Sequence, residues 1–300
     1  MGDALIECVP NFSEGLDHSV VRALTEAIES VAGAMVLREE LDPDHNRSVI
    51  TFAAPPLAAG EAAFRAIAAA VKRIDLRSHA GAHPRIGAAD VVPFVPLSGG
   101  TMELCVEIAQ ALGQRVWTSL GVPVYFYEQA ARSHERVRLE NVRRGGFEHP
   151  RLAPDLGGPA LHPSAGACCI GARKFLIAFN VNLKTTDLGV ARSIARAVRE
   201  SSGGLKAVKA MGVRLAASDL VQVSMNLTDF ERTPLDVVFD AVRDQAAQQG
   251  VEVAGTEIVG LVPRQAIADA ASRSPQWRDL DPALILENRL EAAAKAKMKA

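Results

Sequence analysis

Two pairs of predicted strands follow each other without a helix between them, and this feature limits the fold more than any other. The first pair is expected at 34–37 and 48–53, and the second pair at 205–211 and 220–227. A parallel pair of strands needs a long crossover between them, usually a helix. The sequence therefore favours antiparallel strand pairing in an α+β fold.

Each pair is framed in the same way, by one strand and one helix before it and by one helix and one strand after it. In the first half, these strands are predicted at 5–10 and 90–95, and the helices at about 17–32 and 57–74. In the second half, the strands are predicted at 174–183 and 251–262, and the helices at 187–199 and 234–249. This order is that of the ferredoxin-like split β-α-β unit. The sequence predicts two ferredoxin-like sheet-and-helix subdomains, with the ligand site between them.

Glycine and proline set further expectations in the first half. A helix at 101–112 is expected to end at Gly113, since glycine favours the end of a helix. Pro93 lies inside the strand predicted at 90–95, which indicates a sheet edge or a bulge there. The charged stretch 38–47 is expected to be a loop.

The stretch 151–172 begins with residues too rich in Gly and Pro for a regular element. We expect this stretch to join the two subdomains, which we place at 1–173 and 174–300.

Composition excludes several classes of function. The net charge of −2 argues against general binding to nucleic acids or anionic membranes, and the 5% aromatic content leaves few rings for stacking on single strands. The four cysteines form no C-x-x-C motif, and the N-terminus lacks the pattern of a signal peptide. We therefore expect a cytoplasmic protein.

Residues 78–87, Ser-His-Ala-Gly-Ala-His-Pro-Arg-Ile-Gly, are the first candidate site. Loops that carry such side chains between regular elements often carry function, although a polar turn is an equally good interpretation of the composition. His79 and His83 have the i,i+4 spacing of a zinc pair, but the Gly and Pro beside them oppose a helix. We favour His83 as a general base and acid, because imidazole titrates near neutral pH.

A histidine base needs a group that orients it, and the acidic residues Glu40, Asp42 and Asp44 are candidates. These residues are also compatible with a solvated charged turn.

A second candidate is a loop whose glycines would let backbone N–H groups approach a ligand closely. Its residues are Gly157, Gly158, Pro159, Ala160, Leu161, His162, Pro163, Ser164, Ala165 and Gly166. It is not a P-loop, because no lysine follows in the required place, and an ordinary linker is the alternative. Arg173, Lys174 and Lys184 are candidate partners of an anionic ligand, or simply surface charge. Cys168 and Cys169 are best interpreted as buried packing.

Six phrases stand in order along nearly the whole chain. They are ECVPNFSEG at 7–15, HNRS at 45–48, HPRIGAAD at 83–90, GARKFLIAFNVNL at 171–183, QVSMNL at 222–227 and EIVGLVP at 257–263. Together they resemble the formiminotransferase family.

The resemblance implies a function and a site. The family transfers a formimino group from N-formimino-L-glutamate to N5 of tetrahydrofolate, in histidine degradation, and is usually a homodimer of units with two subdomains. Its catalytic histidine matches His83, and its folate-binding loop matches Gly157–Gly166, so both fall in the predicted N-terminal subdomain. Tetrahydrofolate would be a co-substrate, no metal is implied, and the cyclodeaminase activity of animal relatives is not expected.

Several roles remain hypotheses. A carboxylate of Glu40, Asp42 or Asp44 would stabilise the amidinium charge. Carboxylates of glutamate and folate would be held by Arg85, Arg173, Lys174 and Lys184. Formyl transfer between 5-formyltetrahydrofolate and glutamate, a non-catalytic folate-binding protein and a metal-dependent hydrolase are the alternatives.

Overall fold

The computed structural model describes residues 4–43, 45–81, 85–215, 219–273, 277 and 280–297. The chain divides into two compact units. The first comprises Met1–Arg173 together with Ala293–Ala300, and the second comprises Lys174–Ala292.

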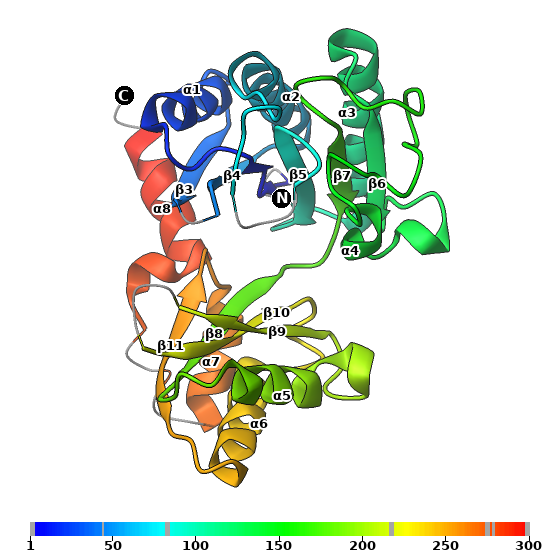
Figure 1. Cartoon of the computed structure of the whole chain (residues 1–300). Helices are drawn as coiled ribbons and strands as arrows, with labels where there is room; N and C mark the ends of the chain where they lie inside the picture. Colours follow the sequence, from blue (N-terminus) through cyan, green and yellow to red (C-terminus); the bar gives the residue numbers. More distant parts are fainter. Residues whose placement is uncertain are drawn as a thin grey trace. The chain divides into compact units, whose positions relative to one another are not determined.

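The first unit contains a seven-stranded mixed sheet with its helices (Figure 1). Its strands are β1 (Ile6–Cys8), β2 (Asn11–Phe12), β3 (Met35–Asp42), β4 (Arg47–Ala54), β5 (Ala89–Pro96), β6 (Val124–Glu128) and β7 (Cys168–Ala172). Its helices are α1 (His18–Glu29), α2 (Pro56–Arg73), α3 (Met102–Leu120) and α4 (Leu139–Val142), with a 3₁₀ turn at His134–Arg136.

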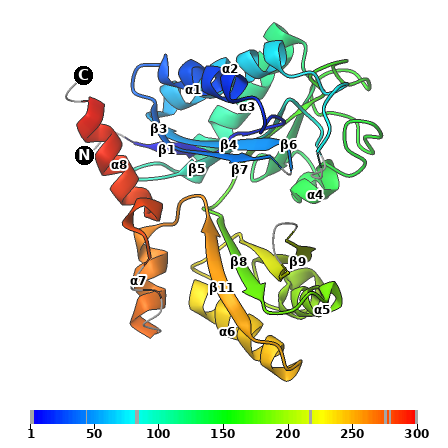
Figure 2. The same cartoon turned by 60° about the vertical axis from the view of Figure 1, so that its left-hand side comes forward.

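The strand order of the first unit confirms the ferredoxin-like prediction and extends it. β4 pairs with β3 on one side and with β1 and β2 on the other, and β1 and β2 also pair with β5, all antiparallel. β7 then lies between β5 and β6, parallel to both. The helices α1, α2 and α3 cover one face of this sheet (Figure 2).

The second unit confirms the same fold in its simplest form. Its four strands are antiparallel in the order β11 (Val253–Val259), β8 (Ile177–Leu183), β10 (Val221–Leu227) and β9 (Val208–Arg214). Its helices are α5 (Leu188–Val198), α6 (Leu235–Gln248) and α7 (Arg264–Arg273), and its 3₁₀ turns lie at Glu200–Ser202 and Pro282–Leu284. The last helix, α8 (Leu286–Lys297), begins in the second unit, and its residues from Ala293 onward belong to the first. Apolar residues of β8, α5 and α6 form its core.

The predicted loop at 38–47 is wrong, because β3 continues as a strand to Asp42. Glu40 pairs with Val49 of β4 and Asp42 pairs with Arg47, after a bulge between Val36 and Arg38. β3 is an edge strand, where charged side chains remain hydrated and are common.

The expected linker at 151–172 is wrong at its C-terminal end. Cys168–Ala172 form β7, which is completely buried in the middle of the sheet between β5 and β6. Parallel pairing brings these residues next to strands distant in sequence, so no local pattern marks them as a central strand.

Two predictions about helix α3 and strand β5 are also corrected. Helix α3 does not end at Gly113 but at Leu120, with Gly121 in the left-handed conformation as its C-cap. A Cβ at Gly113 would lie 2.5 Å from Cζ of Phe126, so this glycine serves close packing of helix on sheet. Pro93 does not lie on an edge, since β5 is an interior strand. It lies opposite the break between β1 and β2, where its carbonyl accepts from Val9 N at 3.3 Å.

No helix within the described part of the chain combines the length and the apolar character needed to cross a membrane.

Candidate functional site

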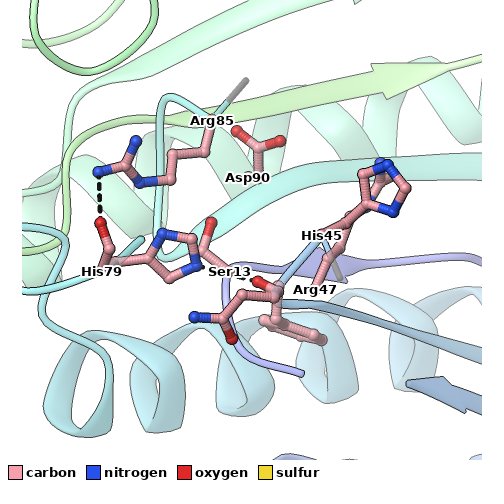
Figure 3. Close-up of a pocket in the computed structure, with 8 residues that line it drawn as sticks. Ser13, His45, Arg47, His79, Arg85 and Asp90 are labelled. Carbon is pink, nitrogen blue, oxygen red and sulfur yellow. Dashed lines mark hydrogen bonds between the residues drawn. The ribbon is translucent and has the colours of Figure 1, made fainter. Parts of the chain in front are cut away.

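A small pocket of the first unit collects side chains from several elements (Figure 3). Its lining residues are Phe12, Ser13, His45, Asn46, Arg47, His79, Arg85 and Asp90. They come from the end of β2, the start of β4, the start of β5 and the loop after α2. Two histidines and two arginines against one carboxylate make this a polar pocket suited to an anionic group.

Asp90 is the central acceptor of the pocket, and its side chain is 4% exposed. One carboxylate oxygen accepts from the backbone N–H groups of Ile86 and Gly87, at 2.7 and 3.3 Å. The other oxygen accepts from Nη2 of Arg143 at 2.5 Å. Asp90 therefore fixes the backbone just after residues 82–84 and ties it to α4, since Arg143 is the residue at the end of that helix.

Arg47 is a second buried charge in the pocket. Burial lowers the pKa of its guanidinium, and the carboxylate of Asp90 opposes this change most strongly. Arg143 lowers the pKa further, while Asp42 raises it. The buried carboxylate of Asp90 thus compensates two guanidinium groups at the same time.

Asn46 connects three segments around the pocket. Its backbone has a φ of 47°, in the left-handed region that asparagine tolerates better than most residues. Its Oδ1 accepts from Gly15 N and its Nδ2 donates to the Ala80 carbonyl, both at 2.9 Å. Ser13 adds a further link, because its hydroxyl donates to the Gly87 carbonyl at 2.8 Å.

His79 and Arg85 hold the loop after α2. His79 Nε2 lies 2.9 Å from the Asn46 carbonyl oxygen. Nη2 of Arg85 donates to the carbonyls of His79 and Leu76, at 3.0 and 3.2 Å, and lies 3.1 Å from the Glu148 carboxylate. In Figure 3, the dashed line marks the bond from Arg85 to the His79 carbonyl.

Glu40 and Asp42, which the sequence suggests as orienting groups, have different partners in the structure. Glu40 forms an ion pair with its own strand neighbour Arg38 at 3.0 Å. Asp42 accepts from the backbone N–H of His45 at 3.0 Å and lies 2.6 Å from its ring Nδ1, so it orients His45, which lines the pocket. His83 and Asp44 lie outside the described residues.

The second candidate loop lies directly beside the first. Gly87 pairs with Gly166, and the backbone N–H of Ala167 donates to the Ile86 carbonyl at 2.9 Å. A Cβ on Gly166 would lie 2.1 Å from the Ile86 oxygen, and a Cβ on Gly87 would lie 1.9 Å from the Ala167 oxygen. Glycine at both positions therefore permits the contact between the two loops.

Within the second loop, the turn 162–166 is well anchored and residues 157–160 are exposed. His162 and Gly166 exchange both backbone hydrogen bonds at 2.9 Å, and Nδ1 of His162 accepts from Ala165 N at 3.0 Å. The exposed part carries backbone groups that a ligand can reach.

The remaining predicted cations are distributed over both units. Arg173 is half-buried at the end of the first unit. Lys174 and Lys184 belong to the second unit and form exposed ion pairs, Lys174 with Asp229 at 2.7 Å and Lys184 with Glu252 at 2.8 Å.

Cys168 and Cys169 are buried in β7, as expected, and burial raises the pKa of both thiols. Among the residues that the structure describes, no cluster of three or more His, Cys, Asp or Glu side chains is arranged to hold a metal ion.

Sequence reasoning missed several residues of the pocket. The family resemblance includes His45, Asn46 and Arg47, but the sequence assigns them no role. The same is true of Asp90, which ends the phrase at 83–90. Arg143 has no local signal at all, because its partner Asp90 is 53 residues away in sequence.

Family models match the two units of the chain. The model described as the formiminotransferase domain, N-terminal subdomain, matches residues 5–173. The model of the formiminotransferase domain matches residues 178–279.

Curated proteins match over almost the full length. A glutamate formimidoyltransferase of Thermoplasma acidophilum is 46% identical over 97% of this chain and 99% of that protein. One of Streptococcus pyogenes serotype M1 is 41% identical over 95% of this chain and 98% of that protein. A formimidoyltransferase-cyclodeaminase of Sus scrofa is 44% identical over 89% of this chain, but the match covers only 52% of that protein.

Proposed function

The chain belongs to the formiminotransferase family, and on that premise we propose that it is a glutamate formimidoyltransferase. It transfers the formimino group of N-formimino-L-glutamate to N5 of tetrahydrofolate and releases L-glutamate. The observation that carries this proposal is the match over nearly the full length of two glutamate formimidoyltransferases. Tetrahydrofolate is then a co-substrate.

The reaction exchanges one nitrogen for another on the amidine carbon. N5 of tetrahydrofolate attacks that carbon, and the bond from the carbon to the glutamate nitrogen breaks. N5 must lose a proton, and the departing nitrogen must gain one. A single imidazole can do both in turn, which is the role we propose for His83, and such help contributes about 10²–10⁴-fold to a rate.

The described neighbours of residues 82–84 support a catalytic role for this loop. Asp90 holds Ile86 and Gly87 on one side, and Asn46 holds Ala80 on the other. These bonds fix the described residues on both sides of His83, and catalysis depends on accurately placed groups.

Of the two carboxylates suggested to act in catalysis, Asp42 is better placed than Glu40. Asp42 contacts His45, which lines the pocket, whereas Glu40 is engaged by Arg38 on the edge strand. We therefore propose that Asp42 acts through His45 on the charge of the bound amidinium.

Substrate binding is proposed for the arginines and for the second loop. Arg85 lines the pocket and is a candidate partner for a glutamate carboxylate. The exposed backbone at Gly157–Ala160 and the anchored turn at Leu161–Gly166 are proposed to contact folate. Arg173, Lys174 and Lys184 are proposed to meet the anionic tail of folate, and the two lysines would exchange their present carboxylate partners to do so.

Further properties are part of the same proposal. We expect a cytoplasmic homodimer that acts on small molecules without a metal and does not bind nucleic acids or membranes.

The proposal is tested by incubating the purified protein with N-formimino-L-glutamate and tetrahydrofolate and measuring the glutamate released. Replacement of His83 by Ala should lower kcat at least about a hundredfold while folate binding persists. Replacement of the exposed His18 by Ala is the control and should leave turnover unchanged. Absence of turnover in the wild-type protein with either a formimino or a formyl donor would refute the function. Full activity of the His83 variant would refute only the role of that residue.

A further inference from the structure

His79 presents a hydrogen-bond acceptor to the pocket. A carbonyl oxygen only accepts, so the Nε2 that lies 2.9 Å from the Asn46 carbonyl must carry the hydrogen. In the neutral ring, this tautomer leaves Nδ1 with a lone pair and no hydrogen. Thus one ring nitrogen anchors the side chain, and the other is an acceptor.

This acceptor has no partner within the described part of the chain. Nδ1 of His79 is buried without a hydrogen bond, although His79 lines the pocket. Buried polar groups in native proteins are almost always paired with protein or water, and leaving one unpaired is costly. An unpaired acceptor in the wall of a pocket is therefore a group that a ligand can satisfy.

Arg85 carries an unpaired hydrogen-bond donor in the same pocket. Its Nε is a buried donor that lacks a partner among the described residues, and the structure contains no hydrogen bond between Nε of Arg85 and the His79 ring. Figure 3 shows both side chains from the same loop in the pocket that Ser13 and Asp90 also line. The pocket thus offers an unpaired donor at Nε of Arg85 and an unpaired acceptor at Nδ1 of His79.

The two possible one-carbon donors differ at the atom that an acceptor would contact. A formimino group ends in nitrogen, which carries hydrogens and, in the amidinium form, a positive charge. A formyl group ends in a carbonyl oxygen, which has lone pairs only. A lone pair on the protein attracts the first group and repels the second, and sites built to bind a substrate N–H reject analogues that lack it.

We propose that His79 is the specificity-determining residue that selects a formimino donor over a formyl donor, by accepting a hydrogen bond from the terminal nitrogen at Nδ1. This inference rests on the proposed function and identifies the donor group for it. The unpaired donor of Arg85 then serves a carboxylate of the same substrate.

The test compares N-formimino-L-glutamate with N-formyl-L-glutamate, each with tetrahydrofolate, as ratios of kcat/KM. The wild-type protein should prefer the formimino donor by at least about a hundredfold. In the His79→Gln variant, the amide nitrogen can take the place of Nε2 and keep the bond to Asn46, while no acceptor remains at the position of Nδ1. We expect the preference to fall by about tenfold to a hundredfold, mainly through loss of formimino turnover.

The His79→Asn variant is the complementary change. Its amide oxygen can take the place of Nδ1, while the anchor to Asn46 is lost, so the preference should largely persist even if the protein is less stable. A purely structural role of His79 predicts the reverse order, with Gln tolerated and Asn harmful. His18→Gln is the matched control, because His18 is exposed on α1 and lies outside the pocket.

The outcomes separate the inference from the function on which it rests. Equal use of both donors by the wild-type protein, or an unchanged preference in His79→Gln, would overturn the role of His79 while formimino transfer stands. A protein that turns over neither donor would instead refute the proposed function. The wild-type comparison needs no variant, so the inference remains testable if a substitution prevents folding.

Discussion

Replacing Asp90 by Asn tests whether one buried carboxylate holds the candidate site together. Asp90 and its partner Arg143 have side chains that are 4% and 14% exposed, so water compensates neither charge well. The amide oxygen of Asn can still accept from Ile86 N, but the negative charge facing Arg143 and Arg47 is lost. Breaking a buried ion pair by removing one partner costs about 3–5 kcal/mol.

The cost should appear as a lower melting temperature of the first unit. We expect the low end of that range, about 3 kcal/mol, because the backbone hydrogen bonds survive, and this corresponds to a fall of roughly 6–12 °C for a unit of this size. Trp117 lies in α3 of the first unit and Trp277 lies in the second. A Trp277→Phe background therefore makes fluorescence report on the first unit, which matters because the two units need not unfold together.

Two comparisons make the result decisive. Adding Arg143→Met to Asp90→Asn removes the guanidinium whose charge the Asp90 carboxylate balances, so the double variant should be more stable than Asp90→Asn alone. Asp75→Asn breaks the exposed pair with Arg77 and should produce no resolvable shift. If Asp90→Asn melts within a degree of the wild type, or the double variant is less stable than the single one, the buried-pair argument is wrong.

Two further predictions follow from the same unit. Gly87→Ala and Gly166→Ala each place a Cβ within 2.1 Å of a backbone oxygen, so each should lower the free energy of unfolding in urea by about 1–3 kcal/mol. Gly158→Ala is the control and should leave this free energy almost unchanged, because no atom lies within 4 Å of its Cβ. Equal stability of all three variants would refute the contact. Burial raises the pKa of Glu7 from 4.5 to about 7, with Arg173 opposing. A raised pKa means that the folded state binds this proton more tightly than the unfolded state does. The protonated carboxyl of Glu7 therefore makes its largest contribution to stability below pH 4.5, and this contribution is lost as the pH rises through about 7. Glu7→Gln should remove this dependence and be more stable than the wild type at pH 8, by up to about 3 kcal/mol; parallel stability–pH curves for the two proteins would contradict this explanation.

The site combines rigid support with unpaired groups at its centre. Asp90, Asn46 and the Gly87–Gly166 contact fix the backbone around the pocket. Nδ1 of His79 and Nε of Arg85 remain unsatisfied within the described residues. Functional sites are expected to break the rule of paired polar groups in this way, because the ligand completes them.

The sequence by itself determined the order of elements and hence the fold of each unit. Helical periodicity along α1 and α2, and strand pairs without a crossover, depend on neighbours close in the chain, and these patterns led to two ferredoxin-like units. The chemistry of residues 78–87 was likewise visible locally, as were the glycines of the second loop. The family phrases connected His83 with formimino transfer and Gly157–Gly166 with folate binding.

Only the tertiary structure decided which of these residues meet. Cys168–Ala172 became a central strand, because parallel pairing depends on partners far along the chain. The Asp90–Arg143 pair and the contact between the two candidate loops join residues more than 50 positions apart. No pattern in a local window encodes such contacts, since the energy that selects them comes from burying charge and backbone groups together in the folded unit.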